Sequence, residues 1–365
     1  MYISELSLFN YRNYEDERIE FDPGVNIIMG ENAQGKTNLI ESIYLCSLGK
    51  SFRTSRYRDL IRFGEDFCRV SVVFQREDES RIDMVVTRDG KKAAKIDGIK
   101  VQRISELLDH IISVVFSPED LKIVKEDPAK RRNFMDREMS QLKLSYLNTL
   151  KLYNRVLSQR NAYLKENRDE KNGLYIWDEK LVEYGSFLMR ERAAFMEKIS
   201  RISGKIHQGI TNGREKLRVK YRPSVKSDDE NSIEDVFMSE LEKNEEADFF
   251  NGNTSRGPHK DDFEVIVDDV NARYYGSQGQ QRTAALSLKL AEIELLKEEK
   301  RENPILLLDD VLSELDSERQ KYLVEYLHDV QLFITTTDIT DEIRESMKGG
   351  RIIEIRGGKA FESKC

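Results

Sequence analysis

The sequence has 365 residues, a net charge of −8 and 35% charged side chains, which is typical of a soluble globular protein. Three scattered cysteines and four scattered histidines, with no Cys-x-x-Cys pair, argue against a disulfide scaffold or a zinc site. No apolar run approaches membrane-spanning length and no charged-then-apolar leader opens the sequence, so we expect a cytoplasmic protein without a membrane partner. The acidic net charge does not exclude nucleic-acid binding, because a local basic stripe decides that property.

Residues 1–115 read as a strand-rich segment that contains one helix. Alternating and apolar stretches predict strands, including a buried strand at 25–29, and Asp-Gly pairs at 89–90 and 97–98 predict hairpin turns. A helix is expected to begin near Lys36, shortly after the buried strand.

The loop between that strand and that helix reads GENAQGKT, Gly30–Thr37, and fits the pattern G-x-x-x-x-G-K-[ST]. Its glycines let backbone N–H groups surround phosphates at the helix N-terminus, Lys36 neutralises the β- and γ-phosphates, and the Thr37 hydroxyl can ligate Mg²⁺. The alternative, a chance glycine turn before a helix, does not account for the strand and helix on either side. Nucleotide binding is therefore predicted for Gly30, Glu31, Asn32, Ala33, Gln34, Gly35, Lys36, Thr37 and Asn38.

From about Pro128 to Gly213 the hydrophobic period is helical. The stretch 137–166 is predicted to form one helix of roughly 30 residues, and a second of similar length is expected after 167–173. One face of the second helix is predicted to carry Tyr184, Leu188, Phe195, Ile199, Ile202 and Ile206. The acidic segment 224–253 is expected to hold a short helix between loops.

The tail returns to strand, helix and strand, beginning with PILLLDDVLSELD, Pro304–Asp316. A parallel strand buried on both faces reads this way, and Asp309 at its carboxyl end could hold Mg²⁺ while Asp310 orients or deprotonates the attacking water. A buried strand with solvated acids at its exit is the alternative. With the phosphate loop present, we predict Lys36, Asp309 and Asp310 as catalytic residues, Thr37 and Asp309 as magnesium ligands, and ATP and Mg²⁺ as cofactors.

The long separation of Lys36 from Asp309 favours an ATPase head split by a helical insertion over a small-molecule kinase. Eight motifs in order then resemble the ABC-type ATPase heads of the chromosome-maintenance and recombination family, and most closely its RecF branch. They are LSLFNYRNYE, IIMGENAQGKTNLIESIY, GKSFRT, FSPEDL with DPAKRRNFMD, GPHKDD, SQGQQRTAALSLKLAE, PILLLDDVLSELD and LFITTTD.

This resemblance implies an α/β fold, an ABC-type P-loop ATPase head with an inserted, mainly helical second lobe. The first ATPase part would span 1–125, the helical lobe with the signature motif 126–290, and the second ATPase part 291–365. It also implies two ATP molecules sandwiched between two subunits that meet head to tail.

The family's signature, usually L-S-G-G-Q, corresponds to Gly276–Gln280 in the stretch YYGSQGQQRTAAL. Ser277, Gly279 and Gln280 match it, and by resemblance they act on the nucleotide of the partner subunit. Gly276 replaces the leucine and Gln278 the first glycine, and no single contact explains Gln278 or Gln281.

Further residues are assigned by the same resemblance. Ser313 and Asp316 match the D-loop that crosses the interface, and Arg12 matches an arginine that reaches the phosphates, with a surface arginine in a hairpin as the alternative. The usual Q-loop glutamine is absent, so Ser117 or its backbone must serve. The switch histidine is absent too, and Thr337 or Asp338 takes its place.

Asp310 stands where many relatives have glutamate, so we expect a weak ATPase that hydrolyses slowly and acts as a switch. Two basic clusters predict contacts to DNA phosphates, with a solvated charged face or nucleotide contacts as the alternatives. They comprise Lys50, Arg53, Arg56 and Arg58, and Lys130, Arg131 and Arg132.

The function implied is an ATP-dependent repair protein. ATP would close a homodimer on duplex DNA near single-strand gaps or at gapped and single/double-strand junctions, and hydrolysis would release it. RecR and RecO would be its partners in loading a recombinase. The alternative is the nucleotide-binding subunit of an ABC transporter. Such a subunit would require the Q-loop glutamine, the switch histidine and an intact signature, none of which is present. A nuclease would need a carboxylate cluster, for which HKDD, His259–Asp262, is the one candidate.

Overall fold

The computed structural model describes residues 1–167, 173–227, 233–327, 329–337 and 350–363. The chain divides into two compact units, the first formed by residues 1–120 with 296–365 and the second by 121–295. The domain limits expected at 125/126 and 290/291 stay a prediction.

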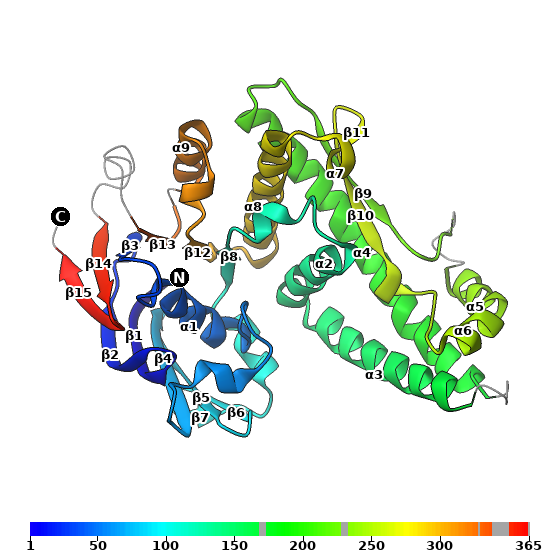
Figure 1. Ribbon diagram of the computed structural model, residues 1–365, viewed down its shortest axis with the longest axis horizontal. Coiled ribbons are helices and arrows are strands. Elements are labelled where there is room, and N and C mark those ends of the chain that lie inside the picture. The colour runs from blue at the N-terminus through cyan, green and yellow to red at the C-terminus, as the bar shows by residue number, and fades with distance from the viewer. Residues whose placement is uncertain (168–172, 228–232, 328, 338–349, 364–365) are drawn as a thin grey trace. The chain divides into compact units, whose positions relative to one another are not determined.

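The first unit contains two six-stranded sheets (Figure 1). One is an antiparallel sheet in the order β2-β1-β4-β5-β6-β7, in which the Asp-Gly pairs form hairpin turns as predicted. Its strands are β1 (Tyr2–Tyr11), β2 (Tyr14–Glu20), β4 (Phe67–Gln75), β5 (Glu79–Thr87), β6 (Lys92–Ile96) and β7 (Ile99–Lys100).

The other sheet has the order β15-β14-β3-β13-β12-β8, and all its neighbours are parallel except the β14–β15 hairpin. Its inner strands are runs of apolar residues, because a parallel sheet is covered on both faces. The strands are β3 (Val25–Met29), β8 (Ser113–Phe116), β12 (Ile305–Asp309), β13 (Leu332–Thr336), β14 (Arg351–Arg356) and β15 (Lys359–Ser363).

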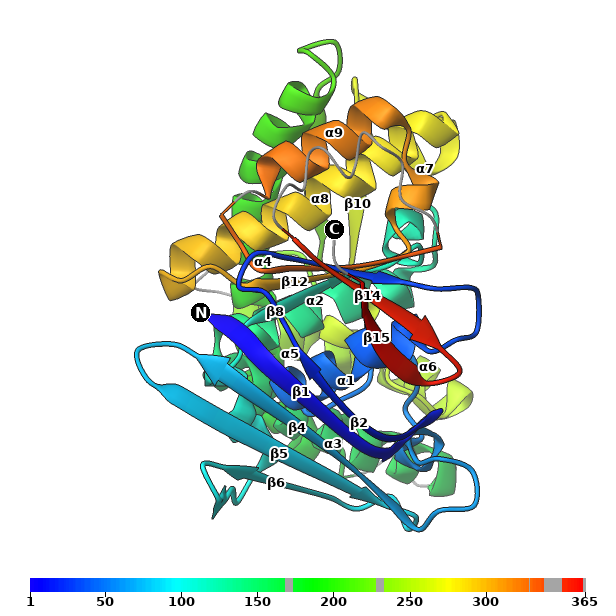
Figure 2. The same ribbon diagram turned by 90° about the vertical axis from the view of Figure 1, so that its left-hand side faces the viewer.

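Helix α1 (Lys36–Leu48) packs against strands of both sheets, and its apolar side chains belong to the core that the sheets share (Figure 2). The parallel sheet brings β3 and β12 together through β13, which lies between them. The carboxyl end of β3 therefore lies near the carboxyl end of β12, although the two strands are far apart in the sequence.

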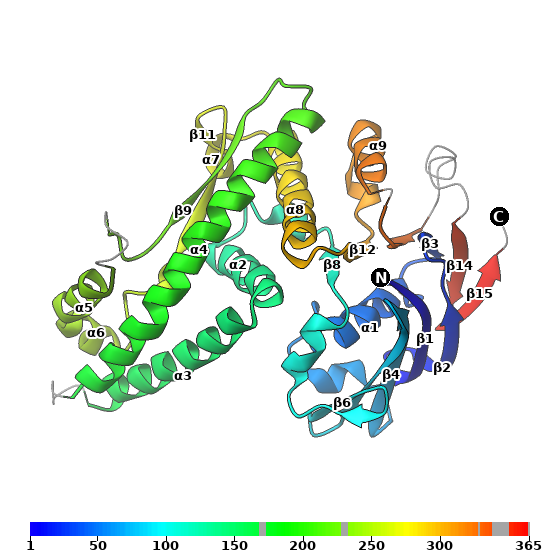
Figure 3. The ribbon, with the colours of Figure 1, turned by 180° about the vertical axis from the view of Figure 1, so that it is seen from behind.

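The second unit is mainly helical and carries a small antiparallel sheet in the order β11-β10-β9 (Figure 3). Helix α4 is 36 residues long and packs along β9, and Leu188, Phe195 and Ile199 on its predicted face are buried. The elements are α2 (Pro128–Leu142), α3 (Leu144–Glu166), α4 (Tyr175–Ile210), β9 (Leu217–Arg222), α5 (Ile233–Lys243), α6 (Glu245–Asn251), β10 (Asp262–Val267), β11 (Val270–Asn271), α7 (Ala272–Tyr275) and α8 (Gln278–Lys300), whose last residues, from 296 on, belong to the first unit.

The single helix predicted over 137–166 is wrong, because Lys143 adopts an extended backbone that ends α2 and begins α3. The break lets the Tyr146 hydroxyl donate to Asp136 at 2.6 Å, and the same carboxylate accepts from Arg192 of α4 at 2.7 Å. Helices α2, α3 and α4 thus meet at a half-buried polar contact, where a single continuous helix was expected over 137–166. The acidic segment likewise holds two helices, α5 and α6, where one was expected.

Candidate nucleotide-binding site

The loop Gly30–Thr37 joins β3 to α1, as predicted from its sequence. Gly30 has a φ of 150°, and a Cβ there would lie 2.4 Å from the Ile355 carbonyl oxygen of β14. Gly35 has a φ of 121°, and a Cβ there would lie 2.7 Å from the Asn13 side chain. Both positions need glycine because of conformation and of space.

The outer side of this loop is held by two hairpin turns. The Gln34 carbonyl accepts from Asn13 Nδ2 at 2.7 Å, and the Tyr14 hydroxyl donates to the Gly35 carbonyl at 3.0 Å. On the C-terminal hairpin, Gly357 N donates to Gln34 Oε1 at 2.6 Å and Gly358 N to the Gln34 carbonyl at 3.2 Å. The carbonyls of Gln34 and Gly35 are therefore satisfied by groups outside the loop.

Lys36 has its side chain folded into the loop. Its Nζ donates to the carbonyls of Gly30 at 2.6 Å and Glu31 at 2.9 Å, and only 7% of the residue is exposed. Burial lowers the pKa of Lys36, and the carboxylates of Asp310 and Asp309 act in the opposite direction. An anion in the loop would offset the cost of burying this cation.

Asp309, at the end of β12, meets the phosphate-loop helix. Its Oδ1 accepts from Thr37 Oγ1 at 2.8 Å and from Thr335 Oγ1 at 2.9 Å. Burial raises the pKa of Asp309, while the two hydroxyl donors lower it. Thr37 and Asp309 are thus in direct contact across 272 residues of sequence.

Thr335 was not predicted as a site residue. Its hydroxyl also accepts the Asp310 N–H at 2.9 Å, so one side chain fixes both neighbouring acids. Asp310 has a φ of 54° and is half-buried, and the Ser313 hydroxyl donates to its carbonyl at 2.7 Å. The sequence does show a run of hydroxyl side chains, Thr335–Thr337, at this strand end, but a periodic strand pattern does not say which hydroxyl faces β12.

The donor set fits a magnesium ion. Mg²⁺ takes oxygen ligands and usually keeps waters and substrate phosphates, so it needs few protein groups. Thr37 Oγ1 and Asp309 Oδ1 are such groups, and a cation beside the Asp309 carboxylate would offset the burial that raises its pKa. Within the described ranges no group of three or more metal-binding side chains occurs.

Arg12 lies in the turn between β1 and β2 with a φ of 55°. Its guanidinium donates to both oxygens of the fully buried Glu41 of α1, at 2.9 and 2.8 Å, and to the Asp59 carbonyl at 2.7 Å. Ser51 donates to the same carboxylate. The structure therefore pairs Arg12 with α1, and Glu41 is a partner that the sequence did not indicate.

Three of the motif residues expected near the nucleotide form local turns. Ser117 donates to Asp120 Oδ2 through both its N–H and its hydroxyl, at 2.9 Å each. Asp316 accepts the Arg319 N–H at 3.0 Å at the start of α9 (Ser317–Tyr326). Ser313 and Asp316 are exposed, as is Thr337, whereas Asp338 lies outside the described residues.

The signature residues lie in the second unit at the N-terminus of α8. Ser277 N donates to Gln280 Oε1 at 3.0 Å and Gln280 N donates to Ser277 Oγ at 3.2 Å, which is a reciprocal capping box. Gln280 Nε2 also donates to Glu215 at 3.2 Å. Ser277 is exposed and Gly279 half-exposed at the positive end of a 23-residue helix, so this N-terminus can receive an anion.

The basic residues predicted to contact DNA differ in their exposure to solvent. Arg53, Arg56, Arg58 and Lys130 are exposed, and Lys50 and Arg132 are half-buried. Arg131 corrects the expectation, because only 3% of it is exposed and its guanidinium holds both oxygens of Asp262 at 2.6 and 2.8 Å. It stabilises the second unit from within and does not present charge to DNA.

The HKDD segment is likewise structural. Asp261 is fully buried and accepts from Arg192 at 2.9 Å, and Asp262 is taken by Arg131. His259 contacts the Tyr153 hydroxyl at 2.7 Å, and burial lowers its pKa to about 4. Neither carboxylate is available as a nuclease ligand.

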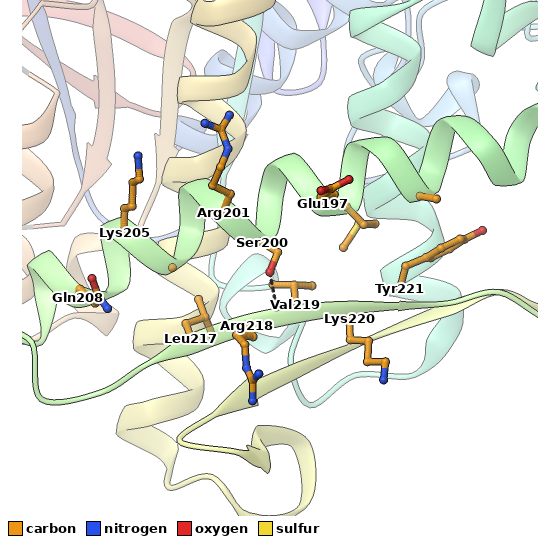
Figure 4. A pocket seen from close by; sticks show the side chains of 13 residues that line it. Glu197, Ser200, Arg201, Lys205, Gln208, Leu217, Arg218, Val219, Lys220 and Tyr221 are labelled. Atoms are coloured by element: carbon orange, nitrogen blue, oxygen red, sulfur yellow. Dashed lines mark hydrogen bonds between the residues drawn. The ribbon is translucent and has the colours of Figure 1, made fainter. Parts of the chain in front are cut away.

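A groove of about 610 Å³ runs between α4 and β9 (Figure 4). Its floor includes Leu217 and Val219, and Ser200 bridges the two elements by accepting the Val219 N–H at 2.9 Å. Arg201 and Lys205 of α4 and Lys220 of β9 are among the residues that line it. None of the predicted site residues lines it.

Comparison with known proteins gives one consistent result. The family model described as the RecF/RecN/SMC N terminal domain matches residues 2–355. The DNA replication and repair protein RecF of Clostridium tetani is 43% identical over 100% of both chains, and that of Alkaliphilus oremlandii is 46% identical over 92% of this chain and 93% of its own.

A solved structure of the recombination mediator protein RecF-ATP in the RecFOR pathway is 39% identical, covers 100% of this chain and 98% of its own, and has a TM-score of 0.91. An Smc head domain from Pyrococcus furiosus, 18% identical with a TM-score of 0.57, shares the fold alone. These likenesses confirm the predicted fold class, an α/β ABC-type P-loop ATPase head.

Proposed function

The chain belongs to the RecF/RecN/SMC family, and from that premise we propose that it is an ATP-dependent DNA repair protein whose ATP-bound state is a homodimer. The contact between Thr37 and Asp309 carries this proposal, because it places the phosphate loop and the acidic strand end at one point. A bound Mg²⁺ would neutralise phosphate charge there, held by these two oxygens.

In this proposal, Lys36 and the loop N–H groups bind the β- and γ-phosphates of one subunit's ATP. Ser277, Gly279 and Gln280 of the other subunit then close on the γ-phosphate, with Ser313 and Asp316 crossing the same interface. Support comes from the exposure of Ser277, Ser313 and Asp316 and from the dipole of α8, whose N-terminus can receive an anion. ATP thereby acts as part of the dimer interface.

Hydrolysis would be slow and would reopen the dimer. Asp310 is the proposed base or orienting group for water, and its carboxylate is one methylene shorter than the glutamate common in such sites. Thr335 holds its backbone, which fixes where the side chain begins. Thr337 and Asp338 stand as the proposed switch.

Two separate clusters would contact DNA phosphates without reading the base sequence. They are Lys50, Arg53, Arg56 and Arg58 of the first unit, and Lys130 and Arg132 of the second. We propose duplex DNA near single-strand gaps as the substrate, cytoplasmic action, and RecR and RecO as partners in recombinase loading. The curated relatives are named for DNA replication and repair, and one solved relative is described as part of the RecFOR pathway. A transporter subunit is not favoured by these likenesses, and no helix among the described residues is long and apolar enough to cross a membrane.

One experiment separates these steps. Self-association and duplex-DNA binding are measured with and without ATP for the wild type, Lys36→Met and Ser277→Arg. We expect ATP-dependent dimers in the wild type only, with nucleotide binding retained by Ser277→Arg and lost by Lys36→Met. Dimers of Ser277→Arg on ATP would contradict the assignment of the signature to the partner's nucleotide.

A further inference from the structure

Gly276 replaces the leucine of the usual signature, and the structure gives a physical reason. A Cβ at this position would lie 2.7 Å from the Ala272 carbonyl oxygen and 3.1 Å from its Cα. The backbone φ of −71° is ordinary, so space and not conformation requires glycine. The short helix α7 is thereby packed directly against the signature loop.

Gln281, which no predicted contact explained, holds α7 in that place. Its Nε2 lies within hydrogen-bond distance of three carbonyl oxygens, of Ala272 at 2.9 Å, of Gly276 at 3.3 Å and of Arg273 at 3.4 Å. Two of these carbonyls belong to α7 and the third to Gly276, the residue that follows it, and the Ala272 carbonyl also accepts the Gly276 N–H at 3.2 Å. Because Gln281 lies in the first turn of α8, one side chain joins the two helices.

Helix α7 presents two aromatic side chains to solvent. Tyr274 is 69% exposed and Tyr275 is 77% exposed, and their ring centroids lie 6.3 Å apart. Ala272, in the same turn, is fully buried and anchors α7. Adjacent exposed tyrosines on a rigid support are the kind of residue that contributes most to protein interfaces, since they lose little side-chain entropy on binding.

We propose that Tyr274 and Tyr275 form an aromatic contact surface for a second copy of this chain, and that Gln281 is the positioning residue that holds this surface beside the signature. The inference rests on the proposed function, in which Ser277 meets the partner's nucleotide. Tyr275 is two residues from Ser277, so their Cα atoms lie at most about 7 Å apart. A partner surface that receives Ser277 therefore passes close to both tyrosines.

The test measures the dimer dissociation constant by sedimentation velocity, without DNA, in a slowly hydrolysed ATP analogue and Mg²⁺. We expect the double variant Tyr274→Ala/Tyr275→Ala to raise this constant at least about tenfold, and Tyr274→Phe/Tyr275→Phe to stay within about threefold, since the rings make the contact. Tyr175→Ala is the matched control, an equally exposed tyrosine at 65% on α4 of the same unit, and is expected to change nothing. Nucleotide affinity of the dilute monomer should be unaltered in all of them.

The positioning role is tested by Gln281→Met, which keeps side-chain length and removes the donor. It should weaken the dimer in the wild-type background and add little in the Tyr274→Ala/Tyr275→Ala background, because a residue that acts through the tyrosines has nothing left to position. Equal effects in both backgrounds would show a structural role alone.

Different outcomes refute the proposed dimer and the tyrosine surface. A wild type that stays monomeric with nucleotide overturns the proposed dimer and this surface with it. A wild type that dimerises while the double alanine variant dimerises equally well overturns only the surface. Normal dimers with weakened duplex-DNA binding would assign the tyrosines to DNA and would also refute the inference.

Discussion

Replacing Thr335 by valine tests how the two acids at the end of β12 are held. The side chain is 1% exposed, and its hydroxyl donates to Asp309 and accepts from the Asp310 N–H, each at 2.9 Å. Valine has nearly the same shape and suits a strand, so the fold is expected to survive. The substitution removes the hydroxyl that hydrogen-bonds both Asp309 and the Asp310 N–H.

The magnitude follows from those two hydrogen bonds. A hydrogen bond to a charged group contributes about 1.5–3 kcal/mol, and an unsatisfied buried N–H costs about 1–3 kcal/mol. If about 2 kcal/mol of this total falls on the transition state, kcat/KM for ATP hydrolysis drops about 30-fold. Thr335→Ser keeps the hydroxyl and is expected to stay within about threefold of the wild type.

The assay is steady-state phosphate release with ATP and Mg²⁺ titrated separately, beside a thermal melt of each variant. Thr335→Val should need more Mg²⁺ for half-maximal activity, because Asp309 retains one hydroxyl donor, from Thr37, in place of two. Wild-type rates for Thr335→Val at every Mg²⁺ concentration would refute the reasoning. Equal losses for valine and serine would show that packing, and not the hydroxyl, matters.

Two further outcomes are expected. Arg160→Met removes a fully buried guanidinium that contacts Asp178 and Asp248 at 2.7 Å each, and it should lower the free energy of unfolding by about 3–5 kcal/mol in urea unfolding followed by the fluorescence of the single tryptophan. The control Arg190→Met breaks an ion pair whose side chains are both 40% exposed, and it should lower that free energy by at most about 1 kcal/mol. Similar losses for both variants would contradict the reasoning from burial. Asp309→Asn should raise the melting temperature of the nucleotide-free protein, because burial raises the pKa of this carboxyl and the wild type loses stability as pH rises through that raised value. The difference in melting temperature between variant and wild type should be larger at pH 7.5 than at pH 4.5. A larger difference at pH 4.5 would refute this prediction.

The phosphate loop could be predicted because its parts are contiguous. The strand Val25–Met29, the loop and the helix that begins at Lys36 follow one another, so local patterns suffice. Asp309 was predicted for a similar reason, as the first acid after a buried run. Its contact with Thr37 nevertheless depends on the order of the sheet.

Residues whose role depends on distant partners could not be found in this way. Thr335 reaches Asp309 only because β12 and β13 pair in a register that sets these two residues side by side. Arg131 lies in a basic run, and its partner Asp262 comes 131 residues later, so charge pattern alone assigned it to the surface. The helix break at Lys143 was missed because the apolar period continues on both sides of it.

The position of β3 in its sheet has a consequence for the order of synthesis. Both of its neighbours, β13 and β14, come from the last 34 residues of the 365-residue chain. A growing polypeptide therefore carries the phosphate-loop sequence long before the two strands that flank β3 have been made. The turn at Gly357 and Gly358 that holds Gln34 comes later still. We therefore expect the ATP site to close only after β13, β14 and this turn have been synthesised.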